Sequence, residues 1–130
     1  MSDHSDPASV AAVYLEAVGR KDFGAFEALL APGVTFKGPA AAVSGAREVR
    51  AAYERLAPVL LRNELKKTFV DGPEVCVIYD FVTDTPGGAV PTVEWLRVEH
   101  GKVVSIWLLT DHVRWPAVLE ELSRRARQRA

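Results

Sequence analysis

The carboxyl group best placed to do chemistry is that of Glu94, in the segment Thr92–Val98, whose sequence is TVEWLRV. This segment is typical of a β-strand, in which successive side chains point to opposite faces, so Glu94 shares a face with Leu96 and Val98. A carboxyl group beside aliphatic side chains lies either at a sheet edge or in an apolar pocket. In a pocket, desolvation raises its pKa, and the neutral acid can donate a hydrogen bond to a developing oxyanion. Periodicity alone leaves a second interpretation open, in which Glu94 is solvated and Trp95 marks the buried face.

The bulk composition predicts one globular domain and excludes several classes of partner. The chain has 130 residues, of which 48% are hydrophobic and 25% are charged, and its formal net charge is −1. That length suffices for one domain with a core, and that charge balance gives no general attraction for nucleic acid or an anionic membrane. No stretch has the length and hydropathy of a membrane span. The polar first residues lack the apolar region of a signal peptide, so we expect a cytoplasmic protein.

Cysteine and histidine are too few and too scattered to predict a metal site. The single cysteine, Cys76, lies in a valine-rich strand segment and is expected to be a packed thiol without a disulfide partner. The three histidines, His4, His100 and His112, have no metal-ligand spacing. We therefore predict neither a metal nor another cofactor.

The pattern of apolar residues predicts helices first and strands second. We expect a disordered leader at 1–7, a single domain at 8–127 and a basic tail end at 128–130. The expected helices span 7–18, 22–30, 47–60 and 116–127, and the expected strands span 34–37, 62–70, 74–84, 90–99 and 102–112. Asp22 and Ser44 are the predicted N-caps, and Pro58 should distort or end the third helix. Helices followed by a strand meander indicate an α+β fold.

A group of apolar residues should lie on the face of the sheet opposite Glu94. Alternation places Trp95 and Trp107 there, and Ile78 falls on the outer face of its own strand. Tryptophans gathered on an outer sheet face predict a homodimer interface. The alternative is that the C-terminal helix or tail covers them.

The order of elements and several motifs resemble a known superfamily. The motifs are Tyr14–Ala17 (YLEA), Lys21–Leu30, Val34–Pro39 (VTFKGP), Ser44–Tyr53 and Gly101–Ile106. Together they resemble the nuclear transport factor 2-like superfamily and, within it, the ketosteroid isomerase branch, over roughly residues 8–112. The resemblance implies a cystatin-like cone: a strongly curved antiparallel sheet wrapped around three N-terminal helices.

The resemblance also implies site residues, one position at a time. The tyrosine that donates to the substrate oxyanion in that family falls on Tyr14, and a second tyrosine that supports it falls on Tyr53. The second acid, usually an aspartate kept protonated, falls on Glu94. The general base, an aspartate before the proline that ends the first strand, falls on Gly38. The chain thus resembles the family in its oxyanion-binding half and lacks the residue that moves the proton. Gly38 could also be a turn residue with positive φ.

The remaining pocket wall follows from alternation and the predicted elements. It comprises Phe36, Leu56, Tyr79, Phe81, Leu96, Leu108 and Thr110, with Gly38 opening space beside them. This set predicts an apolar cavity for a small hydrophobic ligand with a carbonyl or phenol oxygen. The alternative is that these side chains fill one another and leave no cavity. His112 should face the pocket and could act as a base, whereas Asp111 should face away.

Three functional hypotheses remain open from the sequence. The first is an isomerase-like enzyme in which Tyr14 and Glu94 stabilise an enolate, with proton transfer by His112, a water or the substrate. The second is a non-catalytic binding protein for a phenolic or steroid-like ligand, which the glycine at position 38 favours. The third is a polyketide-cyclase-like, dehydratase or hydrolase enzyme that would use His112 or Asp111.

Overall fold

The helices and strands follow one another in the predicted order, with one short strand, Ala42–Ser44, that was not predicted. The structure is a computed structural model that describes residues 6–39 and 41–129. The helices are α1 (Pro7–Gly19), α2 (Phe23–Ala28), α3 (Ala46–Glu54) and α4 (Trp115–Arg129). The strands are β1 (Leu30–Lys37), β2 (Ala42–Ser44), β3 (Leu60–Asp71), β4 (Glu74–Thr83), β5 (Ala89–Glu99) and β6 (Lys102–Thr110). Most of the predicted leader, including His4, lies outside the described residues, as does residue 130 of the predicted tail end.

Short-range capping explains where the N-terminal helices begin. Asp6 caps α1 by accepting a hydrogen bond from the Ser9 amide at 3.1 Å, and Asp22 caps α2 by accepting one from the Ala25 amide at 3.1 Å. These bonds satisfy amides that have no partner within the helix. The predicted cap Asp22 is therefore confirmed.

The third helix differs from its prediction at both ends. Its N-cap is Gly45, whose φ of 96° favours glycine, and Ser44 instead ends β2. The helix ends at Glu54, and a run of turns leads to Leu60. The ring of Pro58 cannot continue a helical hydrogen-bond ladder, which explains the early end.

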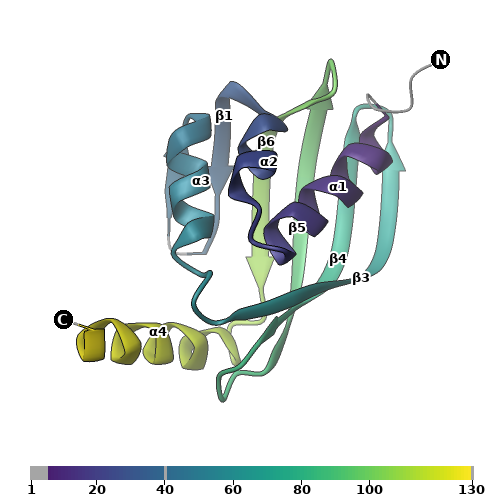
Figure 1. Ribbon diagram of the computed structural model, residues 1–130. Helices are drawn as coiled ribbons and strands as arrows, with labels where there is room; N and C mark the ends of the chain where they lie inside the picture. Colours follow the sequence, from purple (N-terminus) through teal and green to yellow (C-terminus); the bar gives the residue numbers. More distant parts are fainter. Residues whose placement is uncertain (1–5, 40, 130) are drawn as a thin grey trace.

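The sheet has six strands among the described residues, in the order β2-β1-β6-β5-β4-β3. β1 runs parallel to β6, so the sheet is not purely antiparallel as predicted, while all the other neighbouring pairs are antiparallel. Register shifts in β3, near Arg62 and Lys67, are bulges of the kind that bend a strand. Figure 1 shows the resulting open, curved sheet with α1, α2 and α3 on its concave face. This is the predicted α+β cone.

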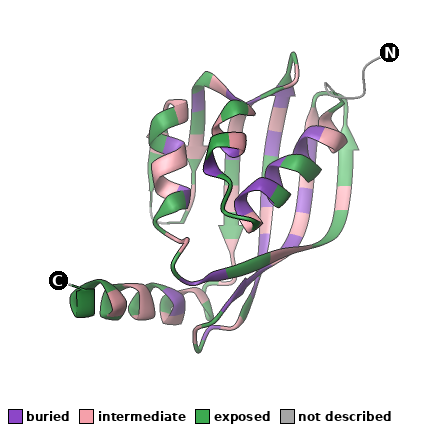
Figure 2. Cartoon of the chain, in the orientation of Figure 1, coloured by how far each residue is buried: buried purple, intermediate pink, exposed green. Residues whose placement is uncertain are grey.

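The two faces of the sheet differ in burial as the alternation predicts. Along β5, the side chains of Val90, Thr92, Glu94, Leu96 and Val98 are buried against the helices, and Figure 2 shows the buried residues concentrated between the sheet and the helices. The core therefore lies between the sheet and α1–α3. The interpretation with a solvated Glu94 is wrong, because its side chain is completely buried.

The outer face of the sheet carries an exposed aromatic pair. The rings of Trp95 and Trp107 lie 5.5 Å apart, and the two residues are 46% and 42% exposed. The alternative in which the C-terminal helix covers these tryptophans is therefore wrong. Ile78 is half-buried on the same face. A homodimer through this face stays a prediction.

Helix α4 is held at the lower end of the sheet in Figure 1, away from the three N-terminal helices. Val118 is fully buried and packs at Gly87, where an added Cβ would lie 2.9 Å from Val118 Cγ2. Arg125 donates to the Pro58 carbonyl at 2.9 Å and to Asp84 Oδ1 at 2.8 Å. Val118 and Arg125 thus help to fix the helix to the body.

We predict that Val118→Ala destabilises the protein, because the substitution removes buried methyl groups and leaves a void. The free energy of unfolding should fall by about 2 kcal/mol, measured by urea denaturation. Val113→Ala removes the same atoms from a residue that is 77% exposed, and it should change stability by less than about 0.5 kcal/mol. Equal effects of the two substitutions would contradict the described packing of α4.

Candidate functional site: a buried glutamate under an apolar cavity

Glu94 lies at the centre of a cluster that includes every tyrosine of the chain. The hydroxyl of Tyr14 donates to Glu94 Oε1 at 2.6 Å, and that of Tyr53 donates to the same oxygen at 2.8 Å. Tyr79 donates to Glu94 Oε2 at 2.5 Å. The hydroxyls of Tyr14 and Tyr53 are themselves 2.7 Å apart. Four oxygen-bearing side chains from distant parts of the sequence therefore meet at one point in the core.

Four different elements position this cluster. Tyr14 comes from α1, Tyr53 from α3, Tyr79 from β4 and Glu94 from β5. Phe26 of α2 packs between the two helical tyrosines, with its ring centroid 5.1 Å from that of Tyr14 and 4.7 Å from that of Tyr53. Such aromatic packing restrains the rings and aims their hydroxyls at the carboxyl group.

Burial raises the pKa of the Glu94 carboxyl, although the hydrogen bonds from the three tyrosines act in the opposite direction. If the carboxyl group is ionised, the three hydroxyls can all donate to it, but the contact between Tyr14 and Tyr53 is then left without a proton of its own. If Oε1 carries a proton, that oxygen can donate to Tyr14, Tyr14 to Tyr53 and Tyr53 back to Oε1, while Tyr79 donates to Oε2, so that each of the four contacts has one proton. The raised pKa and these four contacts together favour a neutral Glu94.

The tyrosines are also neutral. Burial, and then the neighbouring Glu94, raise the pKa values of Tyr14, Tyr53 and Tyr79 well above that of an exposed tyrosine. Their hydroxyls therefore keep their protons and remain hydrogen-bond donors. A ring of neutral donors in a site shielded from water suits an incoming carbonyl or phenol oxygen.

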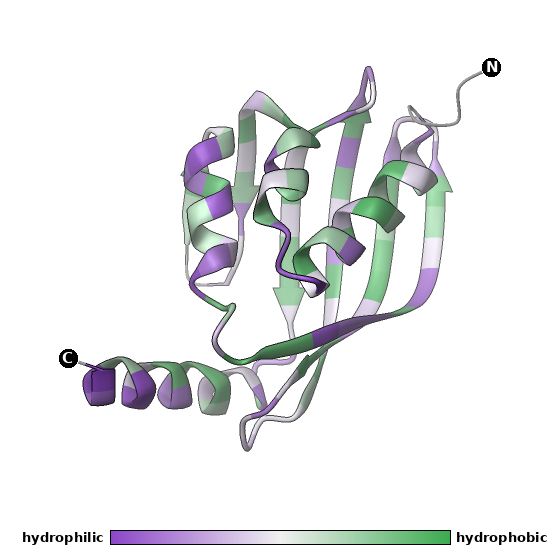
Figure 3. Ribbon diagram, viewed as in Figure 1, coloured by the Kyte–Doolittle hydropathy of each residue, from purple (hydrophilic) through white to green (hydrophobic). Residues whose placement is uncertain are grey.

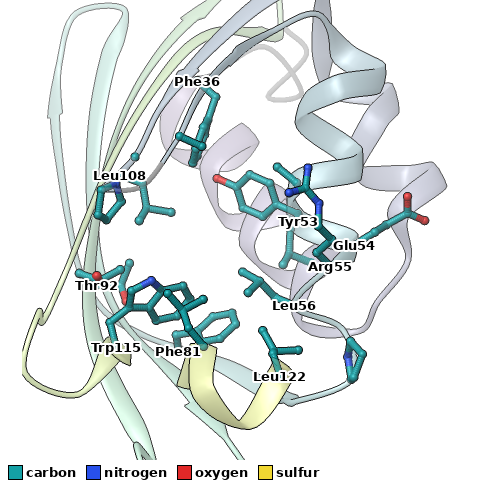
Figure 4. A pocket seen from close by; sticks show the side chains of 18 of the residues that line it. Phe36, Tyr53, Glu54, Arg55, Leu56, Phe81, Thr92, Leu108, Trp115 and Leu122 are labelled. Atoms are coloured by element: carbon teal, nitrogen blue, oxygen red, sulfur yellow. The ribbon is translucent and has the colours of Figure 1, made fainter. Parts of the chain in front are cut away.

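A cavity of about 550 Å³ lies against this cluster. Tyr53 and Tyr79 line it, whereas Tyr14 and Glu94 are fully buried and do not. Figure 4 shows Tyr53 in the cavity wall with its hydroxyl pointing toward Leu108, and its ring centroid lies 5.6 Å from that of Phe36. Phe81, Leu56 and Trp115 form much of the remaining wall, which is mainly apolar. The alternative in which the predicted wall residues fill one another is wrong.

All the predicted wall residues but one line the cavity, and the remaining one lies in the core. Lining residues that were predicted are Phe36, Gly38, Leu56, Tyr79, Phe81, Leu108 and Thr110. Leu96 does not line the cavity, because it is completely buried in the core one strand position beyond Glu94 on the same face. Tyr79 was predicted only as a wall residue. It also donates a hydrogen bond to Glu94, which was not predicted.

Sequence reasoning missed a whole wall of the cavity. Its residues come from one face of α4, namely Trp115, Leu119, Leu122, Ser123, Ala126 and Arg129, and from the segment after Tyr53 with Glu54, Arg55 and Pro58. The apolar members of the α4 set are spaced as on one helix face, which was a usable signal. That spacing does not reveal which part of the molecule the face covers.

Gly38 lies in the cavity wall without the backbone conformation that would require glycine. It is not among the glycines with positive φ, so the interpretation as a positive-φ turn residue is wrong. An added Cβ would lie 2.9 Å from Cε1 and Cζ of Phe36. The Phe36 ring therefore occupies the space that a side chain at position 38 would need.

The two candidate replacement bases lie away from the cavity. β6 ends at Thr110, so His112 lies in an exposed turn. The prediction that His112 faces the pocket is therefore wrong. Asp111 accepts hydrogen bonds from the amides of Val113 at 2.8 Å and Arg114 at 3.2 Å, which lower its pKa. It shapes the turn into α4 as a charged cap.

Within residues 6–39 and 41–129, no group of three or more His, Cys, Asp or Glu side chains is arranged to hold a metal ion. Over the same residues, no helix is both long enough and apolar enough to cross a membrane.

The raised pKa of Glu94 predicts a specific pH dependence of stability. A carboxyl whose pKa is higher in the folded state stabilises fully below its unfolded value, about 4.5, and loses this contribution as pH rises through the folded value. The free energy of unfolding of the native chain, minus that of Glu94→Gln, should therefore decrease as pH rises above about 4.5. A difference that is constant with pH would show that burial does not perturb Glu94.

Comparisons with known proteins agree with this fold. A protein from Kribbella flavida has a TM-score of 0.79 at 24% identity, with 99% of this chain and 100% of that chain covered. A protein with a ketosteroid isomerase-like fold from Catenulispora acidiphila, solved in complex with trimethylamine, has a TM-score of 0.68 at 18% identity, with coverage of 76% and 82%.

A candidate SnoaL-like polyketide cyclase from Shewanella denitrificans has a TM-score of 0.74 at 18% identity, with 88% of this chain and 97% of that chain covered. No curated protein matches the chain significantly. The sequence profile of the SnoaL-like domain matches residues 11–106, which include all four members of the Glu94 cluster. The chain therefore belongs to the SnoaL-like domain family.

Proposed function

We propose that this protein binds a small, mainly hydrophobic molecule through a carbonyl or phenol oxygen that is hydrogen-bonded by Tyr53 and Tyr79. One observation carries the proposal: two tyrosines of the Glu94 cluster, Tyr53 and Tyr79, line an otherwise largely apolar cavity. Apolar walls supply affinity, and a few converging polar groups fix the orientation of the ligand.

The geometry gives each member of the cluster a distinct part in binding. Tyr53 contacts both Tyr14 and Glu94 but has a single proton, so it can turn that proton toward a ligand while Tyr14 continues to donate to the carboxyl. Tyr79, on the sheet, can donate to the same ligand oxygen when the neutral carboxyl group donates to it through Oε2. Glu94 and Tyr14 would act from behind, holding the two lining hydroxyls in place. Such preorganised donors favour an enolate or phenolate oxygen more than a neutral one.

The cavity wall favours binding, or stabilisation of an enolate, over complete proton-transfer catalysis by the protein. Position 38, where the resembling isomerases carry their base, is glycine, and neither His112 nor Asp111 lines the cavity. The cavity-lining carboxylate, Glu54, lies 3.5 Å from Arg50 Nε. Cyclase-like or isomerase-like turnover would then depend on a proton acceptor in the substrate or on a water molecule.

We predict that the fluorescent phenol 2-naphthol binds to the native chain with a dissociation constant in the micromolar range, about −8 kcal/mol. Tyr53→Phe and Tyr79→Phe should each weaken this binding about three- to tenfold, because each removes a hydrogen bond to the phenol oxygen. Naphthalene, which lacks that oxygen, serves as the matched control and should bind all three proteins equally. If both ligands weaken in parallel, the variants have altered the cavity and the proposed hydrogen bonds are not present.

A second prediction tests whether the site lacks only the base at position 38 or differs from that of the isomerases in its geometry. Gly38→Asp combined with Phe36→Leu supplies a carboxylate and removes the ring that would lie 2.9 Å from its Cβ. This double variant should gain isomerisation of a Δ5-3-ketosteroid, moving a proton from the carbon next to the ketone to the far end of the double bond. The native chain and Gly38→Asn with Phe36→Leu should show none. A double variant that binds 2-naphthol and stays inert would contradict an isomerase-like geometry.

A further inference from the structure

The cavity lining contributed by α4 changes from apolar to charged along the helix. On α4, the lining positions begin with Trp115, Leu119 and Leu122 and end with Ala126 and Arg129. A helix rises 1.5 Å per residue, so this wall extends over about 20 Å. Figure 3 shows the same trend, because the C-terminal end of α4 is hydrophilic whereas the side of its earlier turns that faces the body is hydrophobic. The cavity therefore has an apolar part and a charged margin.

The charged margin carries two arginines and one glutamate. Glu54 lies 3.5 Å from Arg50 Nε, and Arg50 also pairs with Glu27 at 2.9 Å. Within the described part of the chain, Arg55 and Arg129 have no carboxylate partner within 4.0 Å. Arg55, the C-cap of α3, and Glu54 belong to the wall drawn at the right of Figure 4. The margin thus has two guanidinium groups available to a ligand and an acid that is already paired.

The inner part of the cavity cannot take the charged end of such a ligand. Tyr53 and Tyr79 are buried there, with a neutral carboxylic acid behind them. A full negative charge moved into that region would lose its hydration without meeting a cation. An anionic group would instead be placed at the margin, where a guanidinium can bind a carboxylate with two parallel hydrogen bonds.

We infer that the natural ligand is an amphipathic anion: an aromatic or polycyclic body with a carbonyl or phenol oxygen at one end and a carboxylate at the other. The oxygen lies at Tyr53 and Tyr79, and the carboxylate lies at Arg55 and Arg129. This inference rests on the proposed function and adds the ligand's charge and its orientation in the cavity.

The test compares two fluorescent probes that differ by one carboxylate, 2-naphthol and 6-hydroxy-2-naphthoate. The native chain should bind the naphthoate about five- to tenfold more tightly at low salt, the range expected for two partly exposed ion pairs. Added salt should reduce that preference. Arg55→Gln with Arg129→Gln should abolish the preference, so that this variant binds the two probes with affinities within about twofold of each other.

Arg127→Gln is the matched control. Like Arg129→Gln, it removes one positive charge from the last turn of α4, but Arg127 is exposed and does not line the cavity, so the preference should persist. Equal affinity of the native chain for both probes would overturn the inference. A preference lost equally in Arg127→Gln would also overturn it, because general attraction to the helix would then explain the effect. Failure of 2-naphthol to bind at all would instead contradict the proposed function, so the two failures are distinguishable.

Discussion

The burial of one carboxyl group constrains much of this structure. Glu94 is completely enclosed on the inner face of β5, where an unpaired charge or an unsatisfied polar group would cost several kcal/mol. The fold meets this cost with three tyrosine hydroxyls from α1, α3 and β4. Those elements must be placed accurately for the hydroxyls to reach the carboxyl. The cluster therefore couples the position of two helices to the register of two strands.

The same constraint links stability to function. A half-satisfied buried network is unfavourable, so the cluster needs either its full set of internal hydrogen bonds or a ligand that replaces one of them. Tyr53 and Tyr79 belong to the cluster and also line the cavity. A ligand oxygen can therefore enter the network without exposing Glu94 to water. The apolar body of the ligand would meet walls from Phe81, Leu108 and α4.

Much of this could be predicted from the sequence because it depends on local rules. Alternation along β5 placed Glu94 and Trp95 on opposite faces of the sheet without deciding which face is buried, and the capping preference of aspartate placed the start of α2 at Asp22. The family resemblance brought Tyr14, Tyr53 and Glu94 together. These expectations concern single elements or patterns that a chain shares with its relatives.

The remaining features depend on how elements pack in three dimensions. Tyr79 could be assigned to the cavity by alternation, but its hydrogen bond to Glu94 depends on the pairing of β4 with β5. His112 was assigned to the pocket by extending β6 by two residues, whereas Asp111 turns the chain into α4. The apolar face of α4 was visible as a spacing, but nothing in that spacing indicated the cavity that it covers.

The central claim is that Glu94 is a neutral acid at neutral pH, and infrared spectroscopy tests it most directly. The difference spectrum between the native chain and Glu94→Gln isolates the vibrations of this one side chain. Our account predicts that the native chain contributes the carbonyl stretch of a protonated, hydrogen-bonded carboxylic acid, which is absent from the variant. A difference spectrum that contains the paired stretches of an ionised carboxylate instead would contradict the account.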